Sequence, residues 1–283
     1  MAIKIGLGGA PPLTTAALRF MLAAGILLTI SLVRRYRFPT DIRTLLQLGY
    51  PGLYMYGLSY ALIYFGEQYI DSSLASVLFG SFPFFVALLS WLRYRKERLT
   101  PLAWIGMLIG FSGVVLISLD SLQVSGNLFL GTLLTVLGAF CAAFGIVIHK
   151  QLYSEKNIVV SACVQMIVGG LPLLLTAVAF ENGSDLSWSL PTLGSIVYLA
   201  VFGTVVAFLG YYWLLSRTGA VTVSLIAFVT PLVAIVIGTL IGDEHMTALT
   251  IAGTVLILSG IVLVIRRPRS QVKTQPEPQS VRS

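Results

Sequence analysis

The feature of this sequence that most limits its fold is a series of long apolar runs separated by short polar segments. A helix that crosses the hydrocarbon core of a bilayer needs about 20 apolar residues, and nine runs come close to that length or exceed it. Only 10% of the 283 residues are charged, which is too few to cover the surface of a soluble domain. The composition excludes a soluble enzyme, a nucleic-acid-binding domain and a disordered chain, and it predicts an integral membrane protein.

We expect these runs to be helices, because backbone groups in lipid must be hydrogen-bonded within their own segment. The runs are also too long and too uniformly apolar for barrel strands. The predicted fold class is therefore an all-α polytopic membrane protein, and the basic segment 266–283 is predicted to be a disordered tail. The expected spans are 13–33, 44–66, 72–92, 101–118, 127–148, 158–180, 191–215, 220–241 and 247–265.

The segments that connect these spans alternate between basic and acidic. All Lys and Arg residues except Lys4 and Arg19 lie in every second segment or in the tail. By the positive-inside rule these basic segments are cytoplasmic. We therefore predict a multi-pass protein of the cell membrane with a cytoplasmic C-terminus, whose net charge of +7 reflects orientation rather than a nucleic-acid partner. The segments without Lys or Arg are 66–71, 119–126, 181–190 and 242–246.

The two halves of the chain resemble each other at offsets of 146 to 148 residues, so that Arg19 falls opposite Gln165. Residues 1–8 match the end of the span at 127–148, so we expect the chain to lack most of an opening helix. Each half then has five helices, and nine of the ten are complete. Because five is an odd number, the two halves insert into the membrane upside down relative to one another. Such inverted repeats are typical of secondary transporters, with a site between the halves. The predicted units are a first repeat at 1–126, a second at 127–265 and the tail.

Three stretches of the sequence resemble the EamA-type drug/metabolite transporter superfamily. The end of its first helix and the start of its second are similar to AIKIGLGGAPPLTTAALRFMLAA. Its helix pairs four–five and nine–ten are similar to LASVLFGSFPFFVALLSWLRYRKERLTPLAWIGMLIGFSGVVLI and SLIAFVTPLVAIVIGTLIGDEHMTALTIAGTVLILSGIVLVI. The resemblance covers the chain up to the tail. It implies a ten-helix inverted-repeat carrier that moves small metabolites, such as amino acids or drug-like compounds, usually by export.

Arg19 is the one charge that lies clearly within a predicted span, about 9 Å from the outer end of its helix at the α-helical rise. A charge at this depth needs a partner, a cavity or an interface. It is either an anchor for a substrate carboxylate or a structural group that snorkels or contacts helix-end carbonyls or Glu67. Because the family that the chain resembles commonly has Arg here, we favour the structural interpretation.

Tyr56, Tyr60 and Tyr64 share one face of the span 44–66 at 100° per residue, and the repeat-related span 191–215 also clusters aromatic residues. Aromatic faces with hydroxyl tips suit a cavity for amphipathic or aromatic solutes. Helix packing or an interfacial belt produces the same stripe. The predicted substrate cavity consists of Arg19, Tyr56, Tyr60, Tyr64, Phe79, Gln165, Tyr198, Phe208, Tyr212 and Trp213.

Two prolines, Pro83 and Pro231, occupy the middle of repeat-equivalent spans, where each frees a backbone carbonyl. They are predicted to act as hinges or, alternatively, only to shape the packing. A set of glycines is predicted to allow close helix approach, with a contact between two copies of the chain as a further use. These glycines are Gly106, Gly110, Gly113, Gly253 and Gly260.

The sequence contains no GxSxG, HExxH or Walker motif, so we expect no catalysis, no metal and no cofactor. No Asp or Glu lies mid-span, and His149 and Lys150 at a span end are interpreted as interfacial, so no proton relay is assigned. We predict a secondary transporter that exports small organic metabolites or drug-like compounds by alternating access. The alternatives are a membrane-embedded scaffold or sensor and a lipid-acting enzyme.

Overall fold

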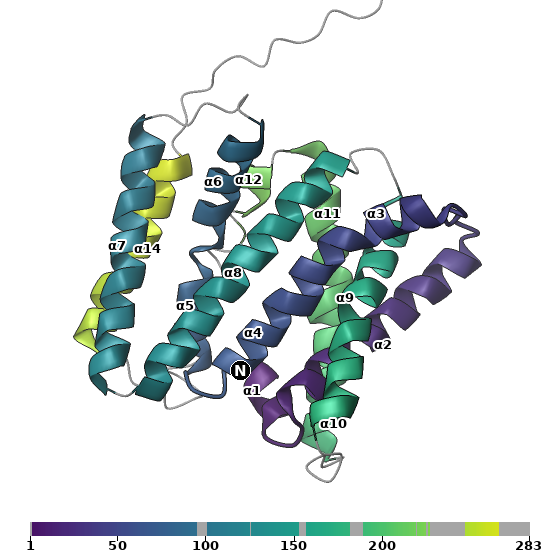
Figure 1. Ribbon diagram of the computed structural model, residues 1–283, viewed down its shortest axis with the longest axis horizontal. Helices are drawn as coiled ribbons and strands as arrows, with labels where there is room; N and C mark the ends of the chain where they lie inside the picture. The colour runs from purple at the N-terminus through teal and green to yellow at the C-terminus, as the bar shows by residue number, and fades with distance from the viewer. Residues whose placement is uncertain are drawn as a thin grey trace, which may run out of the picture.

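The computed structural model describes residues 2–94, 101–124, 126–152, 157–181, 189–218, 220–224, 226 and 247–265. Every regular element in these ranges is a helix (Figure 1). Within these ranges, five helical segments are long and apolar enough to cross a membrane, so the chain is a multi-pass membrane protein. These segments are Pro12–Val33, Leu74–Arg93, Asn127–Lys150, Ile158–Phe180 and Leu190–Arg217. Most of the predicted span 220–241, with Pro231, and the tail lie outside the described residues.

The first half begins with a short helix and two long ones. The short helix α1 covers Ala2–Leu7, and α2 covers Pro12–Val33 with proline at its first position, where its missing N–H costs nothing. The next rod consists of α3 (Ile42–Gly52), the π-helix η1 (Leu53–Leu58) and α4 (Ser59–Gly66). At its exposed start the Asp41 carboxylate accepts hydrogen bonds from the N–H and hydroxyl of Thr44, which lower the pKa of that carboxyl.

The predicted span 72–92 is two helices rather than one, α5 (Ser72–Phe79) and α6 (Phe82–Tyr94). The chain breaks at Gly80 and Ser81, and the Ser81 carbonyl accepts the first backbone bonds of α6, from Phe84 and Phe85. Pro83 therefore lies in the first turn of a new helix. The sequence had placed it in the middle of a continuous span. A proline is tolerated in a first turn because no intrahelical N–H is needed there.

The remaining helices follow in chain order. They are α7 (Pro101–Val124), α8 (Gly126–Leu152), α9 (Ile158–Phe180), α10 (Leu190–Ala200), η3 (Val201–Val206), α11 (Ala207–Arg217), α12 (Ala220–Ser224) and α14 (Ala248–Ile265). Like η1, η3 is a π-helix that joins two α-helices into one rod. Both rods therefore contain a local change in winding.

The elements of the two halves begin at matching intervals. The helices α3, η1, α4 and α5 start 148 residues before α10, η3, α11 and α12, respectively. The intervals are 147 residues between α7 and α14 and 146 residues between α2 and α9. These are the offsets at which the sequence aligns with itself, and the π-helices share them although nothing in the sequence pattern predicts a π-helix.

Equivalent helices also pack against one another, α2 on α9 and α7 on α14, as Figure 1 shows for both pairs. The α7–α14 contact depends on glycine. A Cβ at Gly113 would lie 2.5 Å from the carbonyl oxygen of Gly253, and a Cβ at Gly260 would lie 2.4 Å from that of Gly106. The two backbones therefore meet at two points that the 147-residue interval relates to each other, which is the close approach expected of these glycines.

At the opposite edge of the molecule a carboxylate joins α9 to α2. Glu181, the residue after α9, accepts hydrogen bonds from the backbone N–H groups of Leu13 and Thr14 and from the Thr14 hydroxyl, each 2.7 Å long. Pro11, the N-cap residue of α2, provides no side-chain cap. Glu181 therefore supplies a negative charge and acceptors to an N-terminus that its own sequence leaves uncapped.

Candidate functional site

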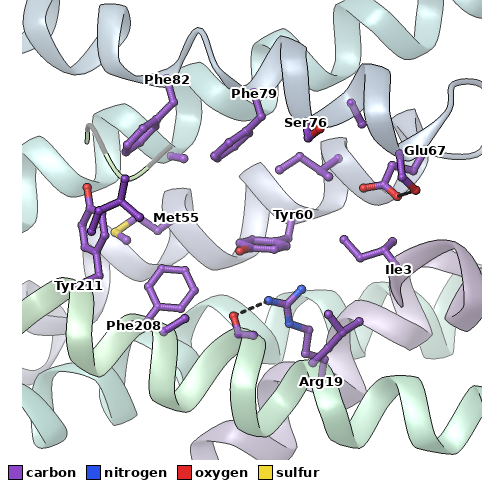
Figure 2. Close-up of a pocket in the computed structure, with 18 residues that line it drawn as sticks. Ile3, Arg19, Met55, Tyr60, Glu67, Ser76, Phe79, Phe82, Phe208 and Tyr211 are labelled. Atoms are coloured by element: carbon purple, nitrogen blue, oxygen red, sulfur yellow. Dashed lines mark hydrogen bonds between the residues drawn. The ribbon is translucent and has the colours of Figure 1, made fainter. Parts of the chain in front are cut away.

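A cavity of about 630 Å³ lies between helices of the two halves (Figure 2). The first half lines it from α2, the η1–α4 rod and the α5–α6 pair, and the second half lines it chiefly from η3 and α11. Its wall is apolar apart from a few polar side chains. Its lining residues include Arg19, Met55, Tyr60, Glu67, Ser72, Ser76, Phe79, Phe82, Phe208 and Tyr211.

Arg19 is 3% exposed, and its guanidinium is held by η3. Its Nε donates to the Thr204 hydroxyl at 2.7 Å, and one terminal nitrogen donates to the Gly203 carbonyl at 3.0 Å. The π-helix explains why that carbonyl is available. The Ala207 N–H donates to Phe202, five residues earlier, and not to Gly203, four residues earlier.

The same guanidinium faces the cavity. Its central carbon lies 4.8 Å from the ring centroid of Tyr60 and 5.2 Å from that of Phe20, both within cation–π range. Figure 2 shows the guanidinium pointing towards Tyr60 and the hollow beyond it. Arg19 thus contacts a helix carbonyl, as the structural interpretation expects, and its position on the cavity wall is also compatible with a substrate contact.

Aromatic rings form most of the remaining wall. Tyr60 and Phe208 lie near Arg19, while Phe79 and Phe82 stack with their ring centroids 5.6 Å apart. Tyr60, Phe79 and Phe208 are three of the residues that the sequence assigned to a cavity. Large rings of this kind bury the apolar part of a small solute, and few hydrogen-bonding groups fix its orientation.

Two polar residues of the wall, Glu67 and Tyr211, were not assigned to the cavity from the sequence, although Glu67 was considered as a partner of Arg19. Glu67 is 7% exposed, lies next to the Ser72 hydroxyl at 3.4 Å and lines one end of the cavity. It follows the last residue of α4, so an apolar-run count places it in a loop. Tyr211 lines the other end, and its buried hydroxyl has no hydrogen-bond partner among the described residues. The predicted cavity face of this helix included Tyr212. Adjacent side chains of an α-helix point about 100° apart, so Tyr211 was not assigned to that face.

Four further side chains form a buried hydrogen-bonded series, which we call the polar chain: Tyr56, Tyr212, Gln165 and His149. The Tyr56 and Tyr212 hydroxyls lie 2.8 Å apart, Tyr212 donates to Oε1 of Gln165, and Nε2 of Gln165 lies 2.7 Å from Nδ1 of His149. The His149 ring stacks on that of Tyr212 at 4.3 Å. The polar chain draws one residue each from η1, α11, α9 and α8, so it crosses between the halves.

The polar chain lies behind the cavity wall and towards the helix ends that carry basic residues. Gln165 is seven residues from the start of α9, about 10 Å along the axis. Lys150, next to His149, donates from Nζ to the carbonyls of Leu215 and Thr218 and thereby caps the end of α11. His149 is only 6% exposed, so at this span end its ring is enclosed by other helices.

The other residues assigned to a cavity lie elsewhere. Tyr64 is fully buried beside Tyr60, with the two ring centroids 6.4 Å apart. Tyr198 is 55% exposed and contacts Phe202 on the outer face, and Trp213 is 50% exposed beneath the Arg217 guanidinium. The structure therefore brings Arg19, Tyr60, Phe79 and Phe208 together at the cavity and keeps Tyr198 and Trp213 away from it.

The described residues contain no cluster of three or more His, Cys, Asp or Glu side chains that could hold a metal ion. Cys163 is buried and Cys141 is partly exposed, and both are free thiols. For recognition of a solute, the cavity wall offers one cation, one carboxylate, sparse hydroxyls and aromatic surface.

Comparison with known proteins agrees with this architecture. The chain is 32% identical over 268 residues to an uncharacterized transporter of Archaeoglobus fulgidus, covering 94% of this chain and 93% of that protein. It is 29% identical to the uncharacterized inner membrane transporter YedA of Escherichia coli, with 93% and 84% covered. It is also 29% identical to a "Probable amino-acid metabolite efflux pump" of Escherichia coli, with 93% and 88% covered.

A crystal structure with 16% sequence identity superposes with a TM-score of 0.67 over 93% of this chain and 94% of the other, which shows that the fold is shared. The model of the EamA-like transporter family matches residues 1–119 and 129–266. The two matched stretches span nearly the whole chain. The chain therefore belongs to the EamA-like transporter family.

Proposed function

We propose that the chain is a secondary transporter that exports small organic metabolites or drug-like compounds across the cell membrane by alternating access. The observation that carries the proposal is the position of Arg19, a buried cation on the wall of an aromatic cavity between the two halves. The family and its relatives are transporters, and one of them is named for amino-acid metabolite efflux. An amphipathic organic anion or zwitterion suits such a wall.

The same proposal includes the two-repeat architecture. The matching intervals between equivalent helices and the paired π-helices support a division into repeats at 1–126 and 127–265. The contacts of α2 with α9 and of α7 with α14 support a two-fold relation between them. In this scheme the halves rock around the cavity, the break before Pro83 serves as one hinge and Pro231 as its counterpart, and the basic helix ends with the C-terminus face the cytoplasm.

Arg19 is proposed to hold the substrate carboxylate with the guanidinium N–H groups that Thr204 and Gly203 do not use. A guanidinium has five N–H donors, and the contacts to η3 occupy two of them. Those contacts also fix its orientation, so binding loses little side-chain entropy. Tyr60 and Phe208 then cover the apolar part of the solute.

Counterflow in proteoliposomes tests this assignment with two solutes that differ only in a carboxylate, L-phenylalanine and phenethylamine. We expect exchange of L-phenylalanine by the native protein. Arg19→Gln should lower kcat/KM for L-phenylalanine by about tenfold to a hundredfold, because a charge-assisted hydrogen bond is worth about 1.5–3 kcal/mol. Exchange of phenethylamine, where it is measurable, should change far less.

Arg217→Gln is the matched control, since Arg217 covers Trp213 on the outside and does not line the cavity. Size-exclusion profiles in detergent show whether each variant is folded. Equal losses for both solutes in a folded Arg19→Gln protein would remove the carboxylate contact from the proposal. No exchange of either solute, or of other amphipathic metabolites, by the native protein would favour the scaffold or sensor alternative.

A further inference from the structure

The polar chain has a direction that depends on the proton at His149. The amide nitrogen of Gln165 only donates, so Nδ1 of His149 accepts its hydrogen bond and carries no proton. Oε1 of Gln165 only accepts, so Tyr212 donates to it. Tyr212 has one hydroxyl proton, and the remaining bond must therefore be donated by Tyr56. All three bonds run in the same sense, from Tyr56 to His149.

A protonated His149 cannot take part in this arrangement. An imidazolium donates from both ring nitrogens, so Nδ1–H would face the amide N–H of Gln165. The contact is restored if the Gln165 amide rotates and presents Oε1 to His149. Its nitrogen then donates to Tyr212, and Tyr212 donates to Tyr56. Every bond is reversed, each hydroxyl keeps its own proton, and the one added proton, taken from water, stays on His149.

The reversal changes which group accepts the hydrogen bond from the Tyr56 hydroxyl. In the observed direction its hydroxyl proton is given to Tyr212, whereas in the reversed direction that proton needs another acceptor. Tyr56 is fully buried and packs edge-to-face on Phe208 at 4.8 Å between centroids, and Phe208 lines the cavity. A buried donor without an acceptor is costly. Protonation of His149 therefore favours a conformation in which the contact between Tyr56 and Phe208 opens.

Several titratable groups surround His149. Those that face it most closely are Lys150, next along α8, and Tyr212, stacked on its ring. Among the described residues, the helices packed against α8 add basic and phenolic groups near this end. These groups are Arg93 of α6, Arg43 and Tyr50 of α3, and Tyr54 and Tyr56 of η1.

We propose that His149 is a proton-binding site coupled to the cavity, neutral in the conformation seen and protonated in the alternate one. The inference rests on the proposed transport function and adds to it the ion that drives transport. Histidine is suited to this role because its ordinary pKa, about 6.5, allows both charge states near neutral pH. The polar chain is the physical link, since it connects His149 to the aromatic wall through three hydrogen bonds.

Proteoliposomes separate coupling from transport when two assays use the same probe, L-phenylalanine. Counterflow exchanges labelled for unlabelled solute and needs no net proton movement. Accumulation of the solute driven by a proton gradient of about one pH unit does need net proton movement. It reaches at most about tenfold if one proton moves per solute. We expect native protein and His245→Gln, which replaces the chain's other histidine, to show both activities.

The expected result for His149→Gln is accumulation that falls to about onefold while counterflow persists. His149→Phe, which keeps a ring on Tyr212, should behave in the same way and guards against a packing defect in the first variant. Accumulation that survives in both variants would overturn the inference. Loss of accumulation in Glu67→Gln but not in the two His149 variants would also overturn it, because that result would place the proton on the cavity carboxylate. Absence of counterflow in the native protein would instead overturn the proposed function, and the inference with it.

Discussion

Two charged side chains obtain their partners from the other half of the chain. Arg19 bonds to Thr204, 185 residues away, and Glu181 bonds to Leu13, 168 residues away. Sequence reasoning identified Arg19 as a charge that needs a partner, because an isolated charge in a bilayer is costly. It could not name Thr204, since helical periodicity gives the face of a side chain but not the helix that covers it. The same limit concealed the role of His149.

Removing the Thr204 hydroxyl should loosen Arg19. Thr204→Val keeps the shape of the side chain but deletes the acceptor for Nε and the bond from this hydroxyl to the Leu199 carbonyl. We expect a loss of about 1–3 kcal/mol in stability, because a buried donor is left unsatisfied. Thermal unfolding in detergent measures it. Thr204→Ser retains the hydroxyl and should stay close to the native value, and equal stability of both variants would contradict the contact.

Removing the Glu181 carboxylate should destabilise the start of α2. Glu181→Ala deletes three hydrogen bonds and the charge at a helix N-terminus, and we expect a loss of about 1–2 kcal/mol. Glu181→Gln keeps one acceptor and loses the charge, so it should fall between the native protein and Glu181→Ala. Hydrogen exchange of the amides of residues 13–15 reports the effect locally. Unchanged exchange in Glu181→Ala would show that α2 does not depend on this cap.

At the scale of the helices, apolar length predicted most boundaries closely. The run 158–180 is α9, and the run 191–215 corresponds to the rod at 190–217. The break at Gly80 and the π-helices were not predicted, because each is a local change in backbone hydrogen bonding within an uninterrupted apolar run. At η3, the Gly203 carbonyl accepts a hydrogen bond from Arg19, a partner outside the run.

The π-helices also explain where face counting failed. Tyr198 and Phe208 are both in the rod at 190–217, but η3 lies between them. One extra residue per turn rotates everything beyond it by about 100°, so residues that share a face at α-helical spacing are separated. Tyr198 faces outward and Phe208 lines the cavity. Beyond η1, by contrast, Tyr60 and Tyr64 lie within one α-helix and stay adjacent.

The pairing of α7 with α14 should fail if a side chain enters the glycine contact. Gly260→Ala places a methyl group 2.4 Å from the Gly106 carbonyl oxygen and 2.5 Å from the Gly110 nitrogen, both backbone atoms that cannot move aside alone. We expect a loss of about 1–3 kcal/mol in thermal or denaturant unfolding. Gly25→Ala is the control, because nothing lies within 4 Å of that position. Similar values for both variants would mean that α7 and α14 are not in close contact.

For the whole molecule, the distribution of charge carries the information on orientation. The C-terminal ends of α6, α8 and α11 point towards the top of Figure 1, and by their bounds these ends carry Arg93, Lys150 and Arg217. The C-terminal ends of α4 and α9, which Glu67 and Glu181 follow in the sequence, point towards the bottom. The cavity end at Glu67 is on the acidic side, and the polar chain is displaced towards the basic side. If the basic side is cytoplasmic, the polar chain lies between the cavity and the cytoplasm in this conformation.

That orientation predicts which loops a membrane-impermeant maleimide reaches in intact cells. In a protein whose two native cysteines, Cys141 and Cys163, are replaced by alanine, Tyr69→Cys should be labelled without permeabilisation. Arg37→Cys should be labelled only after the cells are opened. Both side chains are exposed, so access to the reagent and not burial decides the outcome. The reverse pattern would place the basic loops outside.

The central claim is that the cavity between the two halves opens to each side of the membrane in turn, and one cysteine tests it most directly. Ser76→Cys in the cysteine-free background places a thiol on the cavity wall with little change in volume. Right-side-out and inverted vesicles are treated with the same impermeant maleimide. The account predicts labelling from both sides, with L-phenylalanine slowing each reaction. Labelling from one side only, at a rate that no solute changes, would contradict alternating access.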